Sequence, residues 1–289
     1  MQKAIESAKG KLMLVGEHAV VYEYPCMVMA VNKKISVTIQ KTKSLDLELP
    51  KNSLFVKTAV LTFFKKYKIK SGLNLSTKSD FDSSLGLGSS SAVTVAVIKA
   101  LSKLFNISLS RSDLFDLAYE VVLKVQGKSS GFDLAAAIYE GVIYYQLGKP
   151  TEKLPQRKMP LLVVYSGNKA DTKTLVEKVA ILKKNNPQKT DGIFQKIGDL
   201  VEKSKSAYLK SEWKTLGNLF NQNHKYLIDL GVSTDKLNLL AEKANEFGAF
   251  GAKLSGAGGG DCLILLYPQE NKEAIIEAML KNGGKIIDI

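Results

Sequence analysis

The sequence has 289 residues, of which 45% are apolar, so the chain can bury one large core or two modest ones as a globular protein. Its 41 Lys and Arg against 28 Asp and Glu give a net charge of +13. A net positive charge favours binding to nucleic acid, anionic lipid or small anionic substrates. The lysines are scattered along the chain rather than gathered in one basic block, which favours an ordinary solvated surface for most of them.

The sequence also disfavours membrane-spanning, secreted, disulfide-rich and zinc-binding proteins. No stretch approaches the roughly 20 apolar residues of a membrane span, and the first residues lack the apolar core of a signal peptide. We therefore expect a cytoplasmic protein. The two cysteines, Cys26 and Cys262, and the two histidines support neither a disulfide framework nor a zinc site. We expect both cysteines to be small buried apolar residues.

In the first half, alternation of apolar and polar residues predicts half-buried strands, and helical spacing predicts two helices. Alternation predicts the strands 35–40 and 45–49, short apolar runs predict the strands 11–15 and 27–31, and 73–75 is a further short predicted strand. The predicted helices are 54–67 and 90–105, the second apolar almost all round and hence central.

After about residue 150 the pattern changes to a strand at 161–165 followed by helices, including apolar positions at helical spacing within 193–201 and 213–220. A strand at 262–267, a helix at 272–280 and a strand at 285–289 complete the chain. The sequence therefore predicts an α+β protein with domains at 1–150 and 151–289.

The segment SSLGLGSSSAVTVAVIKAL, residues 83–101, is a loop of small residues that leads into the central helix. Helix N-terminal amides carry partial positive charge, and Gly86 and Gly88 let an anion approach the backbone, so the segment predicts a phosphate cradle. The third glycine of a dinucleotide fingerprint is replaced by Ser91. A flexible turn with a serine N-cap is the alternative.

Two further stretches carry glycines beside polar side chains. In KLSGAGGGDCLILL, residues 253–266, four glycines permit positive φ and close approach of a ligand, although an unusual hairpin turn is the alternative. In VQGKSSGFDLAAAI, residues 125–138, Lys128 and Asp133 precede an Ala-rich helix. Its Gly-Lys-Ser is not a P-loop, because the glycine required five positions before Gly127 is Val122.

The motifs KLMLVGEHAVVYEYP, LGLGSSSA and LSGAGGGDC, in this order, resemble those of the GHMP kinases, which include galactokinases, homoserine kinases, mevalonate kinases and phosphomevalonate kinases. The resemblance covers the whole chain. It implies ATP-dependent phosphoryl transfer by a two-domain α+β fold. The N-terminal, ATP-binding domain would carry a left-handed β-α-β unit and resemble a ribosomal-protein domain, the C-terminal domain would be ferredoxin-like, and ATP and substrate would bind between them.

The segment QGKSSGFD and the Asp261-Cys262 pair resemble the phosphomevalonate kinases. The expected reaction transfers the ATP γ-phosphate to 5-phosphomevalonate, giving 5-diphosphomevalonate in the mevalonate pathway of isoprenoid synthesis. The acceptor brings about two negative charges, which Lys128 would help to neutralise. The segment GEHAVV is closer to mevalonate kinases, which are the alternative. A nucleic-acid-binding protein is the alternative from another class, and three phosphate-type loops in one chain argue against it.

The resemblance also implies roles for individual residues. Lys11 and Asp133 match the family's paired active-site lysine and aspartate. The residues expected at the ATP phosphates are Gly86, Leu87, Gly88, Ser89, Ser90 and Ser91. Those expected at the acceptor are Lys11, His18, Lys128, Ser129, Ser130, Gly131, Ser255, Gly256 and Ala257. For His18, a structural hydrogen bond is the alternative.

ATP and Mg²⁺ are the expected cofactors, with Ser90 as the hydroxyl that reaches the metal. Mevalonate kinases place a Mg²⁺-binding glutamate eleven residues before the aspartate, and here that position is Val122. Glu120 is the remaining candidate ligand, two positions out of register and so facing another direction on a helix. Because a phosphate acceptor is largely ionised at neutral pH, we expect Asp133 to hold Lys11 in place rather than to accept a proton.

Overall fold

The computed structural model describes residues 2–51 and 53–289. The chain forms two compact units that interleave in sequence. The first unit consists of Met1–Lys11, Ala30–Ser83 and Leu87–Gly141, and the second of Leu12–Met29, Ser84–Gly86 and Val142–Ile289. Strands β1 (Lys3–Val15) and β2 (Cys26–Lys41) contribute residues to both units. The domain boundary predicted at residue 150 remains a prediction.

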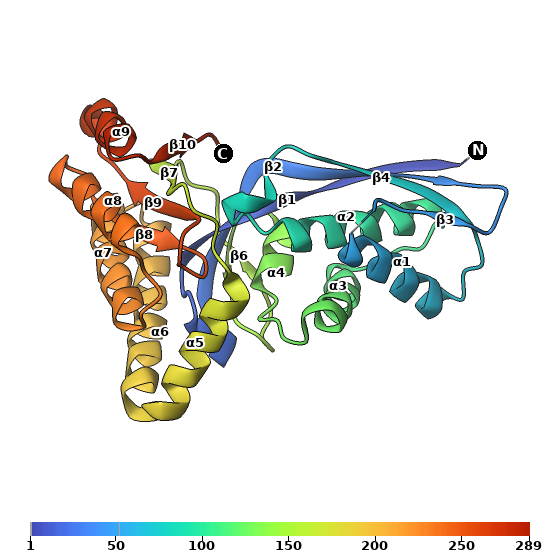
Figure 1. The fold of residues 1–289 in the computed structure, drawn as a ribbon, viewed down its shortest axis with the longest axis horizontal. Coiled ribbons are helices and arrows are strands. Elements are labelled where there is room, and N and C mark those ends of the chain that lie inside the picture. Colours follow the sequence, from blue (N-terminus) through green and yellow to red (C-terminus); the bar gives the residue numbers. More distant parts are fainter. Residues whose placement is uncertain (1, 52) are drawn as a thin grey trace. The chain divides into compact units, whose positions relative to one another are not determined.

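The first unit combines antiparallel strands with a group of helices. The second half of β2 pairs antiparallel with β4 (Leu73–Ser79), which pairs in parallel with β3 (Leu47–Glu48). Figure 1 shows the helices of this unit gathered on one side of these strands. They are α1 (Leu54–Tyr67), α2 (Ser89–Leu104), α3 (Arg111–Gln126) and α4 (Phe132–Tyr139). Helix α2 is the central one, because it contacts α1, α3 and α4 and buries ten of its residues.

The second unit contains a four-stranded antiparallel sheet in the order β10-β7-β9-β8. Its strands are β7 (Leu161–Tyr165), β8 (Gly251–Ser255), β9 (Cys262–Leu266) and β10 (Lys285–Ile287). Helices separate β7 from β8 and β9 from β10, which gives the β-α-β-β-α-β order of a ferredoxin-like domain. The predicted α+β fold with a ferredoxin-like C-terminal part is confirmed.

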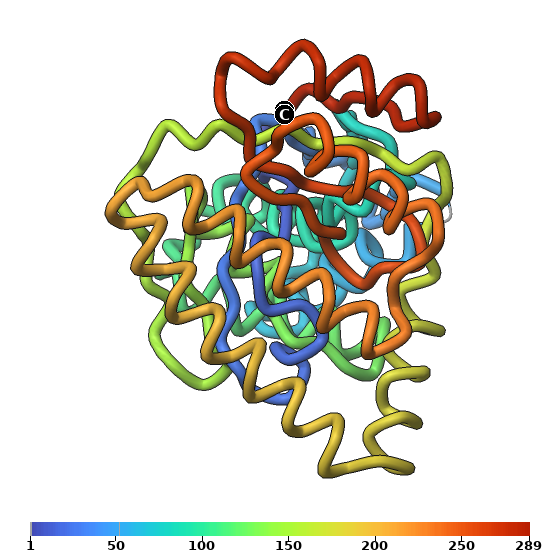
Figure 2. The backbone as a smooth tube through the Cα atoms, turned by 90° about the vertical axis from the view of Figure 1, so that its left-hand side faces the viewer, coloured from blue at the N-terminus to red at the C-terminus, as the bar shows by residue number. Residues whose placement is uncertain are grey.

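Helices α7 (Trp213–Asp229) and α8 (Asp235–Glu246) pack against β8 and β9. Helices α5 (Thr172–Asn185) and α6 (Pro187–Leu209) follow each other directly and are in contact, and Figure 2 shows them in yellow and gold, meeting at their lower ends and diverging from there. Helix α9 (Lys272–Lys281) contacts α8 and β10. The remaining elements of this unit are β5 (Val142–Tyr145), β6 (Glu152–Lys153) and the short 3-10 helices η1 (Ala19–Tyr22) and η3 (Gln269–Asn271), together with all but the first residue of η2 (Ser83–Leu85). Strand β5 pairs with the first part of β2 and with β6.

Most predicted elements lie where periodicity placed them, and helix 54–67 coincides with α1. The two strands predicted at 27–31 and 35–40 are one continuous strand, β2, in which Asn32 and Lys34 are exposed and Lys33 is partly covered. Both cysteines are buried, as predicted. None of the helices in the described part of the chain has both the length and the apolar character that crossing a membrane requires.

Candidate active site

In the first unit, Lys11 lies against Asp133. Lys11 is on β1 and 6% exposed, and its Nζ is 3.4 Å from Oδ1 of Asp133. Asp133 is held in the first turn of α4, whose N-cap is Gly131 in the left-handed conformation. The Lys11 ammonium also lies 5.3 Å from the centre of the Phe132 ring. Asp133 Oδ1 is buried and accepts no hydrogen bond from the described residues, so the ion pair is its polar contact.

The N-terminus of α2 approaches the same lysine. Gly88 is its N-cap at φ 71°, and Ser89, Ser90 and Ser91 form the first turn. The backbone N–H of Lys11 donates to the carbonyl of Leu87 at 2.9 Å, which fixes this loop to β1. First-turn amides have no partner within the helix, so they are available to an anion. The first unit therefore joins an anion-binding helix end to the lysine–aspartate pair.

Gly88 is required for this contact. A Cβ built on Gly88 would lie 3.0 Å from Cγ of Lys11, whereas one built on Gly127, at a similar φ of 77°, would meet nothing within 4 Å. Both Gly88→Ala and Gly127→Ala should lower the free energy of unfolding by about 1–2 kcal/mol, because alanine is strained at positive φ. Only Gly88→Ala should also displace Lys11 and lower kcat at least about tenfold. Urea unfolding and steady-state kinetics of both variants check this, and equal activities would contradict it.

The loop between α3 and α4 is fixed mainly by its own contacts. The Ser129 hydroxyl accepts from the backbone N–H of Gly131 at 3.1 Å, and the Ser129 carbonyl accepts from the Tyr119 hydroxyl at 2.8 Å. Ser130 is partly covered, and the side chain of Lys128 is exposed. The predicted roles of these residues in binding the acceptor remain predictions.

In the second unit, side chains tie the end of β1 and the segment after it to β8 and to the glycine loop that follows β8. The Ser255 hydroxyl donates to the carbonyl of Met13 at 2.9 Å. The buried Lys253 ammonium donates to Glu17. His18 Nε2 lies 2.8 Å from the carbonyl of Ala257. Three bonds thus connect residues 13–18 with residues 253–257.

Within the glycine loop, only part of the backbone is open to a ligand. A Cβ on Gly258 would strike the Val232 carbonyl and one on Gly260 the Asn168 carbonyl, so these glycines are required by packing. A Cβ on Gly256, at φ 98°, would meet nothing within 4 Å. Gly256 is therefore the position in this loop where a ligand can approach most closely.

Asp261 and Cys262, which follow the loop, make local contacts. Asp261 Oδ1 accepts from the backbone N–H of Ala170 at 2.9 Å, and its carboxylate lies directly against Gly86, where a Cβ would clash with it. The Cys262 thiol is 3.3 Å from the Leu85 carbonyl. These contacts hold neighbouring loops of the second unit together, which gives the pair a structural role.

His224 sits beneath β8. Its Nδ1 accepts from the backbone N–H of Leu254 at 3.3 Å, and its Nε2 is buried without a hydrogen-bond partner among the described residues. Burial, together with the nearby Lys253 ammonium, lowers the pKa of His224 to about 4.

Acid should therefore destabilise the protein. Between about pH 6.5 and pH 4 the unfolded chain protonates His224 and the folded chain does not, so the free energy of unfolding should fall by roughly 3 kcal/mol as the pH drops through this window. His224→Asn, whose Oδ1 keeps an acceptor for Leu254, should flatten the decline. Urea unfolding of both proteins at stepped pH values measures it. Equal slopes would contradict this role for His224.

The metal ligands predicted from sequence were Ser90 and Glu120. Ser90 is partly exposed in the first turn of α2. The Glu120 carboxylate is half-exposed on α3 and accepts from Lys124 at 2.6 Å. Residues 2–51 and 53–289 hold no cluster of three or more His, Cys, Asp or Glu placed to bind a metal. Mg²⁺ needs only one or two protein oxygens when phosphates and water complete its shell, so the Ser90 region fits it. Both ligand assignments remain predictions.

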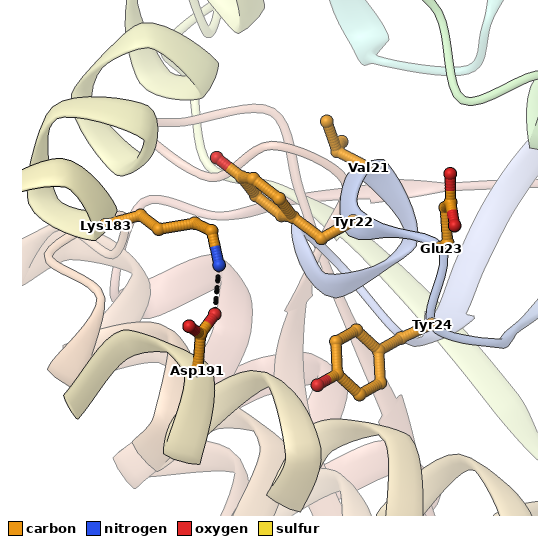
Figure 3. A pocket seen from close by; sticks show the side chains of 6 residues that line it. All are labelled: Val21, Tyr22, Glu23, Tyr24, Lys183 and Asp191. Atoms are coloured by element: carbon orange, nitrogen blue, oxygen red, sulfur yellow. Dashed lines mark hydrogen bonds and ion pairs between the residues drawn. The ribbon is translucent and has the colours of Figure 1, made fainter. Parts of the chain in front are cut away.

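A surface hollow of the second unit lies beside η1 (Figure 3). It is lined by Val21, Tyr22, Glu23, Tyr24, Lys183 and Asp191. Lys183 and Asp191 form an ion pair, and the Tyr22 ring stacks on Phe194 with 4.6 Å between centroids. The hollow contains none of the site residues predicted from sequence.

Comparison with known proteins identifies the class. Residues 54–141 match the GHMP kinases N terminal domain and residues 204–285 match the GHMP kinases C terminal domain. The chain belongs to the GHMP kinases. The mevalonate kinases of Thermococcus sibiricus and Pyrococcus furiosus are 33% and 34% identical to it, over 99% of this chain and 95% of each relative. The crystal structure of the Methanococcus jannaschii mevalonate kinase superposes with a TM-score of 0.83 at 28% identity, covering 98% of this chain and 96% of that one.

These relatives correct the substrate expected from sequence. Phosphomevalonate kinase was inferred from Lys128 and from the Asp261-Cys262 pair, whereas the full-length relatives at 33% and 34% identity are mevalonate kinases. The structure supplies a physical reason for the error. Asp261 and Cys262 hold loops of their own unit, and Lys128 is an exposed side chain, so these residues are poor indicators of a phosphorylated acceptor.

Proposed function

We propose that this protein is a mevalonate kinase, transferring the γ-phosphate of ATP to the primary hydroxyl of mevalonate. The observation that carries the proposal is the Lys11–Asp133 pair beside the N-terminus of α2, in a chain whose full-length relatives are mevalonate kinases. A buried cation next to an anion-binding helix end suits a phosphate, and a carboxylate next to that cation suits the hydroxyl that attacks it.

The change of acceptor alters the expected role of Asp133. A phosphate acceptor ionises unaided near neutral pH, and on that ground we expected Asp133 only to hold Lys11. A primary hydroxyl keeps its proton until it attacks, so a carboxylate within reach can accept that proton as the oxygen–phosphorus bond forms. Asp133 Oδ1, which accepts no hydrogen bond from the described residues, is the atom we assign to this step. Lys11 would then balance the charge on the transferring phosphoryl group.

The loop at 86–91 is proposed to bind the ATP phosphates through its backbone amides. Magnesium, when bound with ATP, supplies positive charge that neutralises the nucleotide phosphates, and Ser90 is the oxygen that would hold it. Gly256 and Ala257 are proposed to border the acceptor, since Gly256 faces open space.

A coupled assay of ADP release with matched acceptors tests the proposal. With mevalonate the purified protein should turn over at a rate typical of small-molecule kinases, and kcat/KM for 5-phosphomevalonate should be at least about a hundredfold lower. Galactose and homoserine serve as controls for other acceptors of the superfamily. Turnover with 5-phosphomevalonate but not mevalonate would refute the proposal.

A further inference from the structure

The Lys253–Glu17 pair is completely buried in the second unit. Lys253 lies in the middle of β8, and both side chains are 0% exposed. The Lys253 ammonium donates to Glu17 Oε1 and to the Leu254 carbonyl, and Glu17 Oε2 accepts from Asn223 at 2.7 Å. Burial lowers the pKa of Lys253, and the charge on Glu17 opposes this shift. Taking two charges out of water is so unfavourable that such pairs contribute little stability compared with apolar side chains.

The residue after Glu17 has a strained backbone. His18 has φ 59° and ψ −44°, and the N–H of Ala19 donates across it to the carbonyl of Glu17 at 2.7 Å. This is the rare γ-turn with positive φ at its centre, which L-residues adopt only when the surroundings enforce it. Something in the fold must therefore hold this turn.

Contacts on both sides enforce the turn. Before it, Glu17 is fixed by Lys253 and Asn223, and after it the His18 ring is fixed by the carbonyl of Ala257. A carbonyl can only accept, so Nε2 of His18 must be the donor. Burial lowers the pKa of His18, so the ring is neutral at neutral pH and Nδ1 carries a lone pair.

We propose that Glu17 and Lys253 are positioning residues that hold the turn at His18, so that His18 Nδ1 accepts a hydrogen bond from a hydroxyl of the substrate. The identity of that substrate as mevalonate rests on the proposed function. The pair acts through His18 and does not itself touch the reacting atoms. The Glu17–Lys253 pair joins the turn to β8, and β8 continues into the glycine loop. One buried contact therefore positions both the turn and the glycine loop.

The test replaces both charges by apolar side chains of similar size. In Glu17→Leu/Lys253→Met no unpaired charge remains, so folding should survive. The matched control is Lys183→Met/Asp191→Asn, which removes the ion pair in the hollow of Figure 3, where Lys183 Nζ lies 5.1 Å from the ring centre of Tyr22 in η1. The control pair is partly exposed and should leave the turn intact.

Two readouts separate positioning from simple stabilisation. Because the sequence has only two histidines, ¹⁵N-imidazole spectra resolve His18 directly, with His224→Asn for assignment. The wild type and the control should show His18 as the Nε2–H tautomer, and the double variant should show a mixture. The KM for mevalonate should rise at least about tenfold in the double variant while the KM for ATP changes less than about threefold. A folded double variant with unchanged His18 signals and unchanged mevalonate KM would overturn the inference.

Asn223→Ala provides a milder variant should the double variant not fold. It keeps both charges and removes only the donor to Glu17 Oε2, so a smaller change of the same kind is expected in both readouts. Unchanged His18 signals in this folded variant would overturn the inference equally. Failure of the wild type to phosphorylate mevalonate would refute the proposed function instead. The ¹⁵N spectra need no substrate, so they would still decide whether the pair holds the turn.

Discussion

Replacing Asp133 by asparagine is expected to lower kcat with mevalonate by roughly 10²- to 10⁴-fold, the range that general-base catalysis contributes. Asparagine keeps the shape of the side chain but cannot accept the proton of the attacking hydroxyl. A primary alcohol does not ionise between about pH 6 and about pH 9, so the loss should persist across that range. Pre-steady-state and steady-state rates over this range measure it.

The matched control lies at the other end of the same helix. Glu140 caps the C-terminus of α4 and pairs with Lys9 at 3.1 Å, as Asp133 at the N-terminus pairs with Lys11. The Lys9–Glu140 pair is partly exposed, with 36% and 39% of the side chains accessible. Glu140→Gln should therefore leave kcat within about twofold of wild type. Equal effects of Asp133→Asn and Glu140→Gln would remove the catalytic role of Asp133.

Replacing Lys11 by methionine is expected to lower kcat by roughly 10²- to 10³-fold, because the proposed function assigns this preorganised charge to the transferring phosphoryl group and the variant lacks it. Methionine keeps the packing of a side chain that is only 6% exposed. Lys9→Met, two residues earlier on β1, is the matched control and should change kcat less than about twofold.

The double variant Lys11→Met/Asp133→Asn completes a cycle. In the proposed reaction the two groups act on one reacting centre, so their effects should be strongly non-additive, and the double variant should be little slower than the worse single variant. Thermal melting of all variants separates loss of fold from loss of catalysis. Additive losses would show that the ion pair seen at 3.4 Å does not act as a unit.

Sequence patterns predicted regular elements well in α1, which has one apolar face, and in β7, which is an uninterrupted apolar run. It failed at β2, where Asn32, Lys33 and Lys34 interrupt the alternation and resemble a turn. The strand nevertheless continues, because its two halves are held by pairing with β5 and with β4. Whether a strand continues through polar residues depends on the strands that pair with it. Those strands lie far away in the sequence, so a local pattern does not reveal them.

The candidate site was also predicted only in part. The pairing of Lys11 with Asp133 was expected from motif resemblance, and the two side chains are in contact. Glu17, Asn223 and Lys253 were missed. One signal was present, since a lysine within the apolar strand GAKLS needs a buried partner. The partner lies 236 positions away in the sequence, so only the fold could identify it.

³¹P NMR of the product identifies the oxygen that receives the phosphoryl group. With ATP, Mg²⁺ and mevalonate, we expect the γ-phosphate signal to be replaced by a phosphomonoester signal that the adjacent methylene protons split into a triplet. With 5-phosphomevalonate we expect no new signal on the same timescale. Two mutually coupled phosphorus signals from 5-phosphomevalonate, with no phosphomonoester formed from mevalonate, would show that the acceptor is a phosphate and not a hydroxyl.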